Sequence, residues 1–324
     1  MRRQSLSERL DGVLSTILSG GQLQPAPEDP ELTALGRIAS ALQGLPSEEF
    51  RARLANRLAA PAAPATTPEK RTGAREGFHT VNLYLAVERA EDLLDFVKGV
   101  FGATETLRTK GSLGGLHAEV RIGDSMVMIG GKEGIGQTPS AIHLYVEDTD
   151  AVYRRALEAG ATSLHEPMEQ PYGERSAGVA DGFGNFWYIA TYRGRHHVPE
   201  GLQAVNPYLH VHGTGGLIDF LEKGMGGQVL DRAQSAQGVI QHAKVRIGDS
   251  VVEMGEARGP YQPIPTAIYL YVPDVDGLYR DAVAAGATSE QEPTSMPYGD
   301  RVAFVKDPFG TTWYIATHLG RAAR

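Results

Sequence analysis

The amino-acid sequence predicts an α+β protein with two tandem domains that follow a small helical N-terminal region. The main observation is an internal repeat: residues 141–148, 160–163, 171–175 and 183–191 return in recognisable form at 267–274, 286–289, 297–301 and 309–317. The offset is 126 residues here and falls to 125 and then 124 toward the start of the repeat, as expected for two diverged copies. A repeat this long is too large for one solenoid unit, so it predicts two complete globular domains.

Composition narrows the class of protein. A chain of 324 residues has room for two domains and an appendage, and its net charge of −8 without a long basic run argues against nucleic-acid binding. The sequence has no cysteine, which excludes disulfides, thiolate metal sites and cysteine nucleophiles. No apolar run approaches the roughly 20 residues that span a bilayer, and no signal-peptide core follows the first residues. We therefore expect a cytoplasmic protein with no membrane contact.

Residues 1–60 differ from the repeats. Three apolar stripes with helical spacing predict three short helices, which need partners to bury those stripes. These helices would form an appendage docked on the repeats, or a module that contacts a second copy of the chain or another protein. Residues 61–77 are rich in Ala, Pro and Thr and then charged, which predicts a linker.

Each repeat is expected to contain two βαβββ units. In the first unit of each repeat, the sequence predicts a strand (80–87 and 205–212), a helix (around 93–100 and 217–223) and a Gly-Asp hairpin turn (122–125 and 247–250). The first range in each pair belongs to the first repeat and the second range to the second repeat. The second unit begins at Ala141 or Ala267, and its helix runs from near Asp148 or Asp274 to Gly160 or Gly286. Two units together make a domain of about 115 residues, an ordinary size.

The expected boundaries follow from these elements: a first domain at 78–195, a connection at 196–204 and a second domain at 205–320. The sequence leaves open whether the four units pair within each repeat or across the two repeats.

Several motifs carry a resemblance to a known family. They are Tyr208-Leu, the stretch 242–250, Tyr298-Gly-Asp-Arg, and Asp307-Pro-Phe-Gly with Trp313 behind it. Together they resemble the vicinal oxygen chelate superfamily of glyoxalases, extradiol dioxygenases and bleomycin-resistance proteins, and within it a PhnB-like branch. The resemblance covers residues 78–320 and implies curved eight-stranded sheets that enclose cavities. It does not fix the function, because this fold serves metal enzymes and metal-free drug binders alike.

The resemblance also implies where a metal would bind. The family's metal enzymes place ligands on the first and last strand of each unit, and the matching residues here are Asn82, Met128, Ala141, Tyr188, Asn206, Glu253, Ala267 and Tyr314. Glu253 is the only carboxylate among them, and Ala and Met offer no hard donor. We therefore expect no metal at the usual site and no cofactor.

Strand alternation predicts which residues face each cavity. A two-residue hairpin at 247–250 pairs Lys244 with Glu253 on one face. Grouped by repeat, the second cavity would hold Tyr208, His210, His242, Lys244, Glu253, Tyr269, Tyr271 and Tyr314. The first would hold Tyr84, His117, Glu119, Met126, Met128, His143, Tyr145 and Tyr188. Trp187 and Trp313 fall on the opposite face, in the core under the helices.

The two predicted cavities differ in chemistry. Met and Tyr side chains in the first suit a flat or apolar ligand. Glu253, His242 and His210 in the second could perform acid/base chemistry, or hold a metal at a displaced position, or form only an ion pair with Lys244 and structural hydrogen bonds.

Two other features predict scaffold rather than chemistry. Tyr172 with Arg175 recurs as Tyr298 with Arg301, which favours a shared turn at the cavity rim. His196 and His197 lie in the connection and are assigned to it.

Three functions remain open. The protein would bind a small aromatic or amphipathic metabolite or drug without turnover, as drug-resistance members of the family do. Alternatively, it would be a lyase, isomerase or dioxygenase-type enzyme with its chemistry in the second domain, so the sequence leaves enzyme activity undecided. The third alternative is a ligand-sensing interaction protein that uses residues 1–60 to contact a partner.

Overall fold

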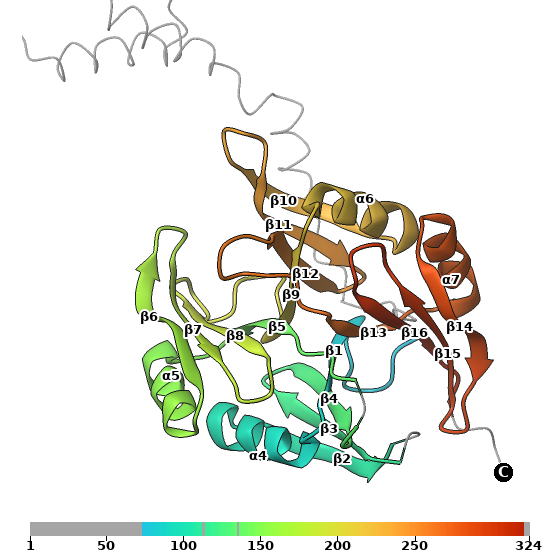
Figure 1. Cartoon of the computed structure of the whole chain (residues 1–324), viewed down its shortest axis with the longest axis horizontal. Coiled ribbons are helices and arrows are strands. Elements are labelled where there is room, and N and C mark those ends of the chain that lie inside the picture. Colours follow the sequence, from blue (N-terminus) through green and yellow to red (C-terminus); the bar gives the residue numbers. More distant parts are fainter. Residues whose placement is uncertain (1–72, 112–113, 135, 321–324) are drawn as a thin grey trace, which may run out of the picture. The chain divides into compact units, whose positions relative to one another are not determined.

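A computed structural model describes residues 73–111, 114–134 and 136–320. The predicted N-terminal helices at 1–60 and most of the linker lie outside these residues. The described chain is mixed α+β with two eight-stranded sheets and helices packed on them (Figure 1). None of the helices described is long and apolar enough to cross a bilayer.

The described chain contains the four predicted βαβββ units. The first comprises β1 (Val81–Ala86), α4 (Ala90–Phe101), β2 (Thr104–Lys110), β3 (Leu116–Ile122) and β4 (Ser125–Gly131). The second comprises β5 (Ala141–Tyr145), α5 (Thr149–Glu158), β6 (Thr162–Gln170), β7 (Glu174–Ala180) and β8 (Phe186–Tyr192). The third comprises β9 (Val205–Val211), α6 (Thr214–Gly224), β10 (Gln228–Gln234), β11 (Ile240–Ile247) and β12 (Ser250–Glu256). The fourth comprises β13 (Ala267–Tyr271), α7 (Val275–Ala284), β14 (Thr288–Ser295), β15 (Asp300–Lys306) and β16 (Thr312–His318).

Local sequence signals set the limits of the helices. The side chains of Asp148 and Asp274 accept hydrogen bonds from backbone N–H groups in the first turns of α5 and α7, as N-caps do. Gly102 ends α4 in the left-handed conformation, and its N–H donates to the carbonyl of Val97.

The hydrophobic cores follow the sequence repeats. One buried cluster joins α4 and α5 to the strands of the first two units, and a second joins α6 and α7 to the strands of the last two. Trp187 and Trp313 are fully buried in these cores, as predicted, and each indole N–H donates to a buried aspartate, Asp181 or Asp307, at 2.9 Å. In Figure 1 the pairs α4/α5 and α6/α7 accordingly lie on opposite sides.

The two sheets, in contrast, cross the repeats. Sheet A has the order β14–β15–β16–β13–β1–β4–β3–β2, and sheet B has the order β10–β11–β12–β9–β5–β8–β7–β6. Sheet A thus joins the first unit to the fourth through β1 and β13, and sheet B joins the second to the third through β5 and β9. Each sheet has one face under the helices, and we call the other its open face.

One short segment precedes the first strand of each repeat, and the two segments have equivalent backbone contacts. We call residues 73–80 strap A and residues 197–204 strap B. The N–H of Tyr271 donates to Thr80 O and the N–H of Tyr145 donates to Ala204 O, both at 2.8 Å. Residues 73–77 and the connection at 196–204, predicted as linkers, therefore include segments hydrogen-bonded to the sheets.

Candidate functional site

The crossing of the sheets corrects the predicted grouping of cavity residues. His143, Tyr145 and Tyr188 belong to sheet B rather than to the set around Met128, and Tyr269, Tyr271 and Tyr314 belong to sheet A rather than to the set around Glu253. The physical reason is that β5 pairs with β9, while β13 pairs with β1. The sheet A set is therefore Tyr84, His117, Glu119, Met126, Met128, Tyr269, Tyr271 and Tyr314. The sheet B set is His143, Tyr145, Tyr188, Tyr208, His210, His242, Lys244 and Glu253.

A buried carboxylate lies at the centre of the sheet B set. Glu253 on β12 is 1% exposed, and its two oxygens accept from His143 Nδ1 at 2.8 Å and His242 Nε2 at 3.0 Å. Lys244 is paired with Glu253 across the strands, as the hairpin predicts, and its Nζ lies 3.9 Å from Oε2. Two of the predicted neighbours, His242 and Lys244, thus lie beside Glu253, and His143 joins them from the other repeat.

Glu174, at the start of β7, supplies a second buried carboxylate, which was not among the predicted cavity residues. Tyr145 O–H donates to its Oε1 at 2.8 Å, and His143 Nε2 lies 3.6 Å from its Oε2. The imidazole of His143 therefore lies between two carboxylates. A signal was available, because Glu174 and Asp300 are the acidic residues of the repeated Pro-Tyr-Gly-x-Arg motif.

Burial and charge set the protonation of these groups. Burial alone would lower the pKa of His143, but the negative charges of Glu253 and Glu174 raise it to about 9. Burial alone would raise the pKa of Glu253, but the charge and hydrogen bond of His143, the hydrogen bond from His242 and the charge of Lys244 hold it well below its usual range. At neutral pH the centre of the set is therefore an imidazolium held by ionised carboxylates.

Four rings gather beside this charged centre. Tyr208 and His210 on β9 lie with ring centroids 4.7 Å apart, and Tyr261, from the loop before β13, stacks on His210 at 5.3 Å. Burial lowers the pKa of His210 to about 4, so its imidazole is neutral, and its Nε2 shares a hydrogen bond of 2.8 Å with the hydroxyl of Tyr188. Tyr261 was not predicted because it lies in a loop. The sheet B face thus combines an aromatic cluster with paired charges.

The sheet A face has different contents. Strap A places Phe78 edge-on to Tyr271 at 5.6 Å, and Arg75 forms an ion pair with the buried Glu119. Phe78 packs with Met128 and Tyr269 in a hydrophobic cluster on this face.

The remaining sheet A residues also contact one another. Tyr84 lies between His117 and Tyr314, at 5.9 and 5.6 Å between ring centroids. Tyr269 and Tyr271 both donate to Asp300 Oδ2 at 3.1 Å, and His318 Nδ1 lies 2.6 Å from Oδ1. The side chains on this face, including two from strap A, are therefore in contact with one another.

The donors at the family's metal positions do not form a suitable ligand set. Sheet A brings together Asn82, Met128, Ala267 and Tyr314, and sheet B brings together Ala141, Tyr188, Asn206 and Glu253. The amides of Asn82 and Asn206 hold the straps, donating to the carbonyls of His79 and Gln203 at 2.7 Å.

Both oxygens of Glu253 are engaged by histidines, and the part of the chain that the structure describes contains no group of three His, Asp or Glu side chains arranged for a metal ion. The residues at these positions therefore do not fit a metal ion.

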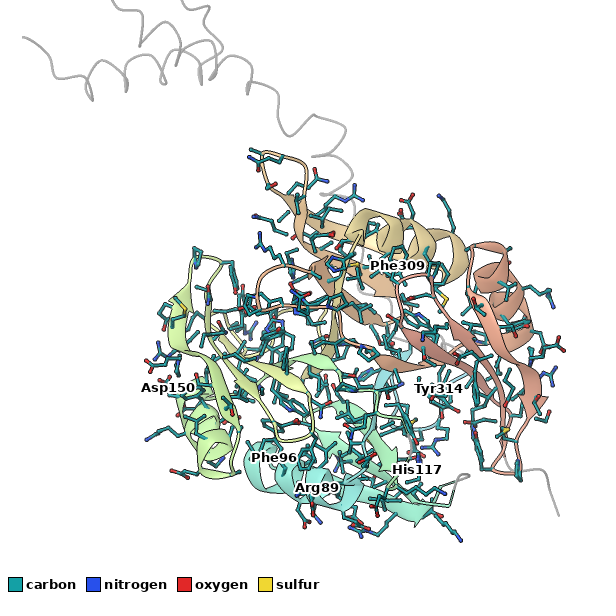
Figure 2. The ribbon with its side chains drawn as sticks, in the orientation of Figure 1. Arg89, Phe96, His117, Asp150, Phe309 and Tyr314 are labelled. Atoms are coloured by element: carbon teal, nitrogen blue, oxygen red, sulfur yellow. The ribbon has the colours of Figure 1, made fainter. Side chains whose placement is uncertain are left out.

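The repeated arginines act in the scaffold. Arg175 binds Asp150 at the start of α5, and Arg301 binds Asp276 in α7 with both distances at 2.7 Å. Figure 2 shows Asp150 at the outer side of α5. These pairs tie a helix to the third strand of its unit and do not point to the open faces.

Comparison with known proteins agrees with this architecture. Residues 77–189 and 214–315 match the model of the Glyoxalase/Bleomycin resistance protein/Dioxygenase superfamily. The chain belongs to this superfamily. The predicted PhnB-like branch stays a prediction.

Uncharacterized proteins of Mycobacterium bovis and Mycobacterium tuberculosis are 40% identical over 119 residues, which is 33% of this chain and 78% and 70% of those proteins. Glyoxalase I from Zea mays has a TM-score of 0.58 at 16% identity and covers 73% of this chain and 91% of its own. A putative dioxygenase from Bacillus subtilis has a TM-score of 0.52 at 16% identity and covers 74% of this chain and 85% of its own. At these identities, the two structures show the fold alone.

Proposed function

We propose that this protein binds a small aromatic or amphipathic molecule on the open face of sheet B. The observation that carries the proposal is the contrast between the faces. Arg75 and Phe78 of strap A pack on sheet A, while sheet B presents the aromatic cluster of Tyr188, Tyr208, His210 and Tyr261 beside a charged centre. Aromatic side chains with polar tips suit flat molecules that carry a few polar groups.

The protonation of the site favours binding over acid/base catalysis. A general base works best with a pKa near the working pH. The pKa of Glu253 is lowered and that of His143 is raised to about 9, so at neutral pH the first is a weak base and the second is already protonated. These two groups are set to hold fixed charges.

Binding can be tested with phenylnaphthylamine, a neutral aromatic molecule that fluoresces on leaving water. We expect stoichiometric binding by the full chain, and recovery of the compound unchanged. Tyr208→Ala should weaken binding at least tenfold, while Tyr84→Ala, the equivalent change 124 residues earlier on sheet A, should leave it within twofold. Equal losses in both variants, or no saturable binding, would refute the assignment to sheet B.

One observation keeps an enzyme as the second candidate. The imidazole of His242 is 31% exposed, while its Nε2 contacts the buried Glu253. A bound molecule could therefore exchange a proton with a carboxylate-linked imidazole, as an isomerase or lyase requires. In that case incubation would yield a converted compound, Glu253→Gln would abolish conversion and Met128→Leu on sheet A would keep it.

A further inference from the structure

The two straps provide an internal comparison, because the same backbone segment lies on both sheets. His318 N–H donates to Gly73 O at 2.7 Å in sheet A, and Tyr192 N–H donates to His197 O at 3.0 Å in sheet B. Each strap contains one tight turn, and the two turns lie at equivalent positions, 124 residues apart in the sequence. In strap A Phe78 N–H donates to Arg75 O at 3.1 Å, and in strap B Leu202 N–H donates to Pro199 O at 3.2 Å. Both turns contain a Glu-Gly pair whose glycine has positive φ. Side chains at equivalent strap positions therefore start from equivalent places.

Strap A supplies a cation and an aromatic ring to its sheet. The Arg75 guanidinium pairs with Glu119 and lies over the Phe78 ring, 4.4 Å from its centroid. Strap A therefore occupies part of the open face of sheet A, with a charged group against β3 and an aromatic ring against Tyr271 on β13.

Strap B has neither group. Pro199 stands where strap A has Arg75, and Leu202 stands where it has Phe78. The charge on the facing strand is also reversed. Lys244 on β11 occupies the position equivalent to Glu119 on β3, because Lys244 pairs with Glu253 across the hairpin and Glu119 pairs with Met128. A cation therefore stands on sheet B where sheet A has an anion.

The groups within reach of a molecule on sheet B are cationic or neutral donors. The acids Glu253 and Glu174 are 1% and 5% exposed. Both oxygens of Glu253 accept from histidines, and Glu174 Oε1 accepts from Tyr145, while the buried Glu174 Oε2 has no hydrogen-bond partner and lies 3.6 Å from His143 Nε2. The side chains of Lys244 and His242 are 26% and 31% exposed. The Nζ of Lys244 lies 3.9 Å from Glu253 Oε2, so the two form an ion pair without a direct hydrogen bond, and the N–H donors of Lys244 are not used by Glu253.

We propose that sheet B takes an anionic ligand, with a carboxylate, sulfonate or phosphate against Lys244 and His242 and an aromatic or apolar body under strap B. This inference rests on the proposed binding function and specifies the chemical class of the ligand. The ligand would place an anionic group and a ring on sheet B, as Arg75 and Phe78 place a cationic group and a ring on sheet A.

Two fluorescent probes with the same ring system separate charge from shape. Anilinonaphthalene sulfonate is anionic, and phenylnaphthylamine is its neutral counterpart. We expect the full chain to bind the sulfonate about tenfold more tightly, as one charge-assisted hydrogen bond allows. Lys244→Met should abolish this preference and leave the dissociation constant of the neutral probe within twofold, while Lys223→Met on the exposed face of α6 should change neither.

The outcomes distinguish the two proposals. If both probes bind with equal affinity and both respond to Tyr208→Ala, the binding function stands and the anionic class is wrong. A preference that persists in Lys244→Met also overturns it. If neither probe binds, both proposals fail.

A graft tests the place of the ligand directly. The triple variant Pro199→Arg, Leu202→Phe, Lys244→Glu recreates the residues of strap A and its partner on sheet B. We expect it to lose binding of both probes at least tenfold with an unchanged circular dichroism spectrum. Unchanged binding by this folded variant would show that the ligand does not occupy the place of the strap side chains.

Discussion

The imidazolium of His143 makes the stability of this protein depend on pH in a defined direction. A pKa raised from 6.5 to about 9 means that the folded state holds the proton more tightly than the unfolded state does. At about 1.4 kcal/mol per tenfold change in proton affinity, this corresponds to about 3 kcal/mol of folding free energy. The contribution is complete below pH 6.5 and is lost as the pH rises through 9. The lowered pKa of Glu253 reflects the same contact and is not added to it.

The assay is urea unfolding of the wild type and His143→Gln at about pH 6 and pH 9.5. We expect the substitution to reduce the free energy of unfolding at both pH values, and the reduction to be about 3 kcal/mol larger at pH 6 than at pH 9.5. The reason is that the wild type carries the paired imidazolium only at the lower pH. His196→Gln, which changes an exposed histidine of the connection, is the control and should show no such difference. A stability loss in His143→Gln that is the same at both pH values would refute the assignment of His143 as a cation.

Two further predictions concern other polar groups. His210 has a pKa lowered to about 4 by burial, so the unfolded state gains a proton first as the pH falls below 6.5; His210→Phe should therefore reduce the loss of stability between pH 6.5 and 4, by up to about 3 kcal/mol, in urea unfolding. If wild type and variant lose stability in parallel, His210 is protonated in the fold. Arg75→Ala removes the guanidinium that pairs with the buried Glu119 and should cost about 2 kcal/mol by the same assay. Arg301→Ala, which breaks a partly exposed pair with Asp276, should leave the midpoint of urea unfolding near that of the wild type. Equal effects of the two arginine changes would show that strap A contributes little to the fold.

The sequence predicted the local structure well because local rules decide it. The Gly-Asp turn at 247–250 fixes the register of β11 and β12, and Lys244 faces Glu253 as the count from the turn requires. The alternation of strands likewise placed Trp187 and Trp313 under the helices.

The pairing of units could not be read from the same signals. β5 and β13 have nearly the same sequence, so the pattern of β1 fits either partner equally well. The choice depends on how the two repeats pack, which is a property of the whole chain and leaves no periodic signal. For this reason His143 was grouped with Glu119 and Met128 of the first repeat, whereas it lies beside Glu253 and Glu174.

The straps were missed for a different reason. Residues 73–77 have the composition of a linker, and the connection before β9 was read in the same way. Their ordering comes from backbone hydrogen bonds to β16 and β8 and from the amides of Asn82 and Asn206, none of which depends on apolar residues in the straps. The Glu-Gly pairs at 76–77 and 200–201 were the available signal.

The crossing of the sheets has a consequence for synthesis on the ribosome. Asn82 on β1 and Tyr269 on β13 face each other across sheet A and are 187 residues apart. At about 5–20 residues per second, β1 waits on the order of ten to forty seconds after its own synthesis before its partner emerges. Sheet B needs no strand beyond β12, so it can close first, and one edge of β1 keeps its backbone groups unpaired during that interval. The nascent chain is thus exposed to strand exchange with a neighbouring copy until the last unit has left the ribosome.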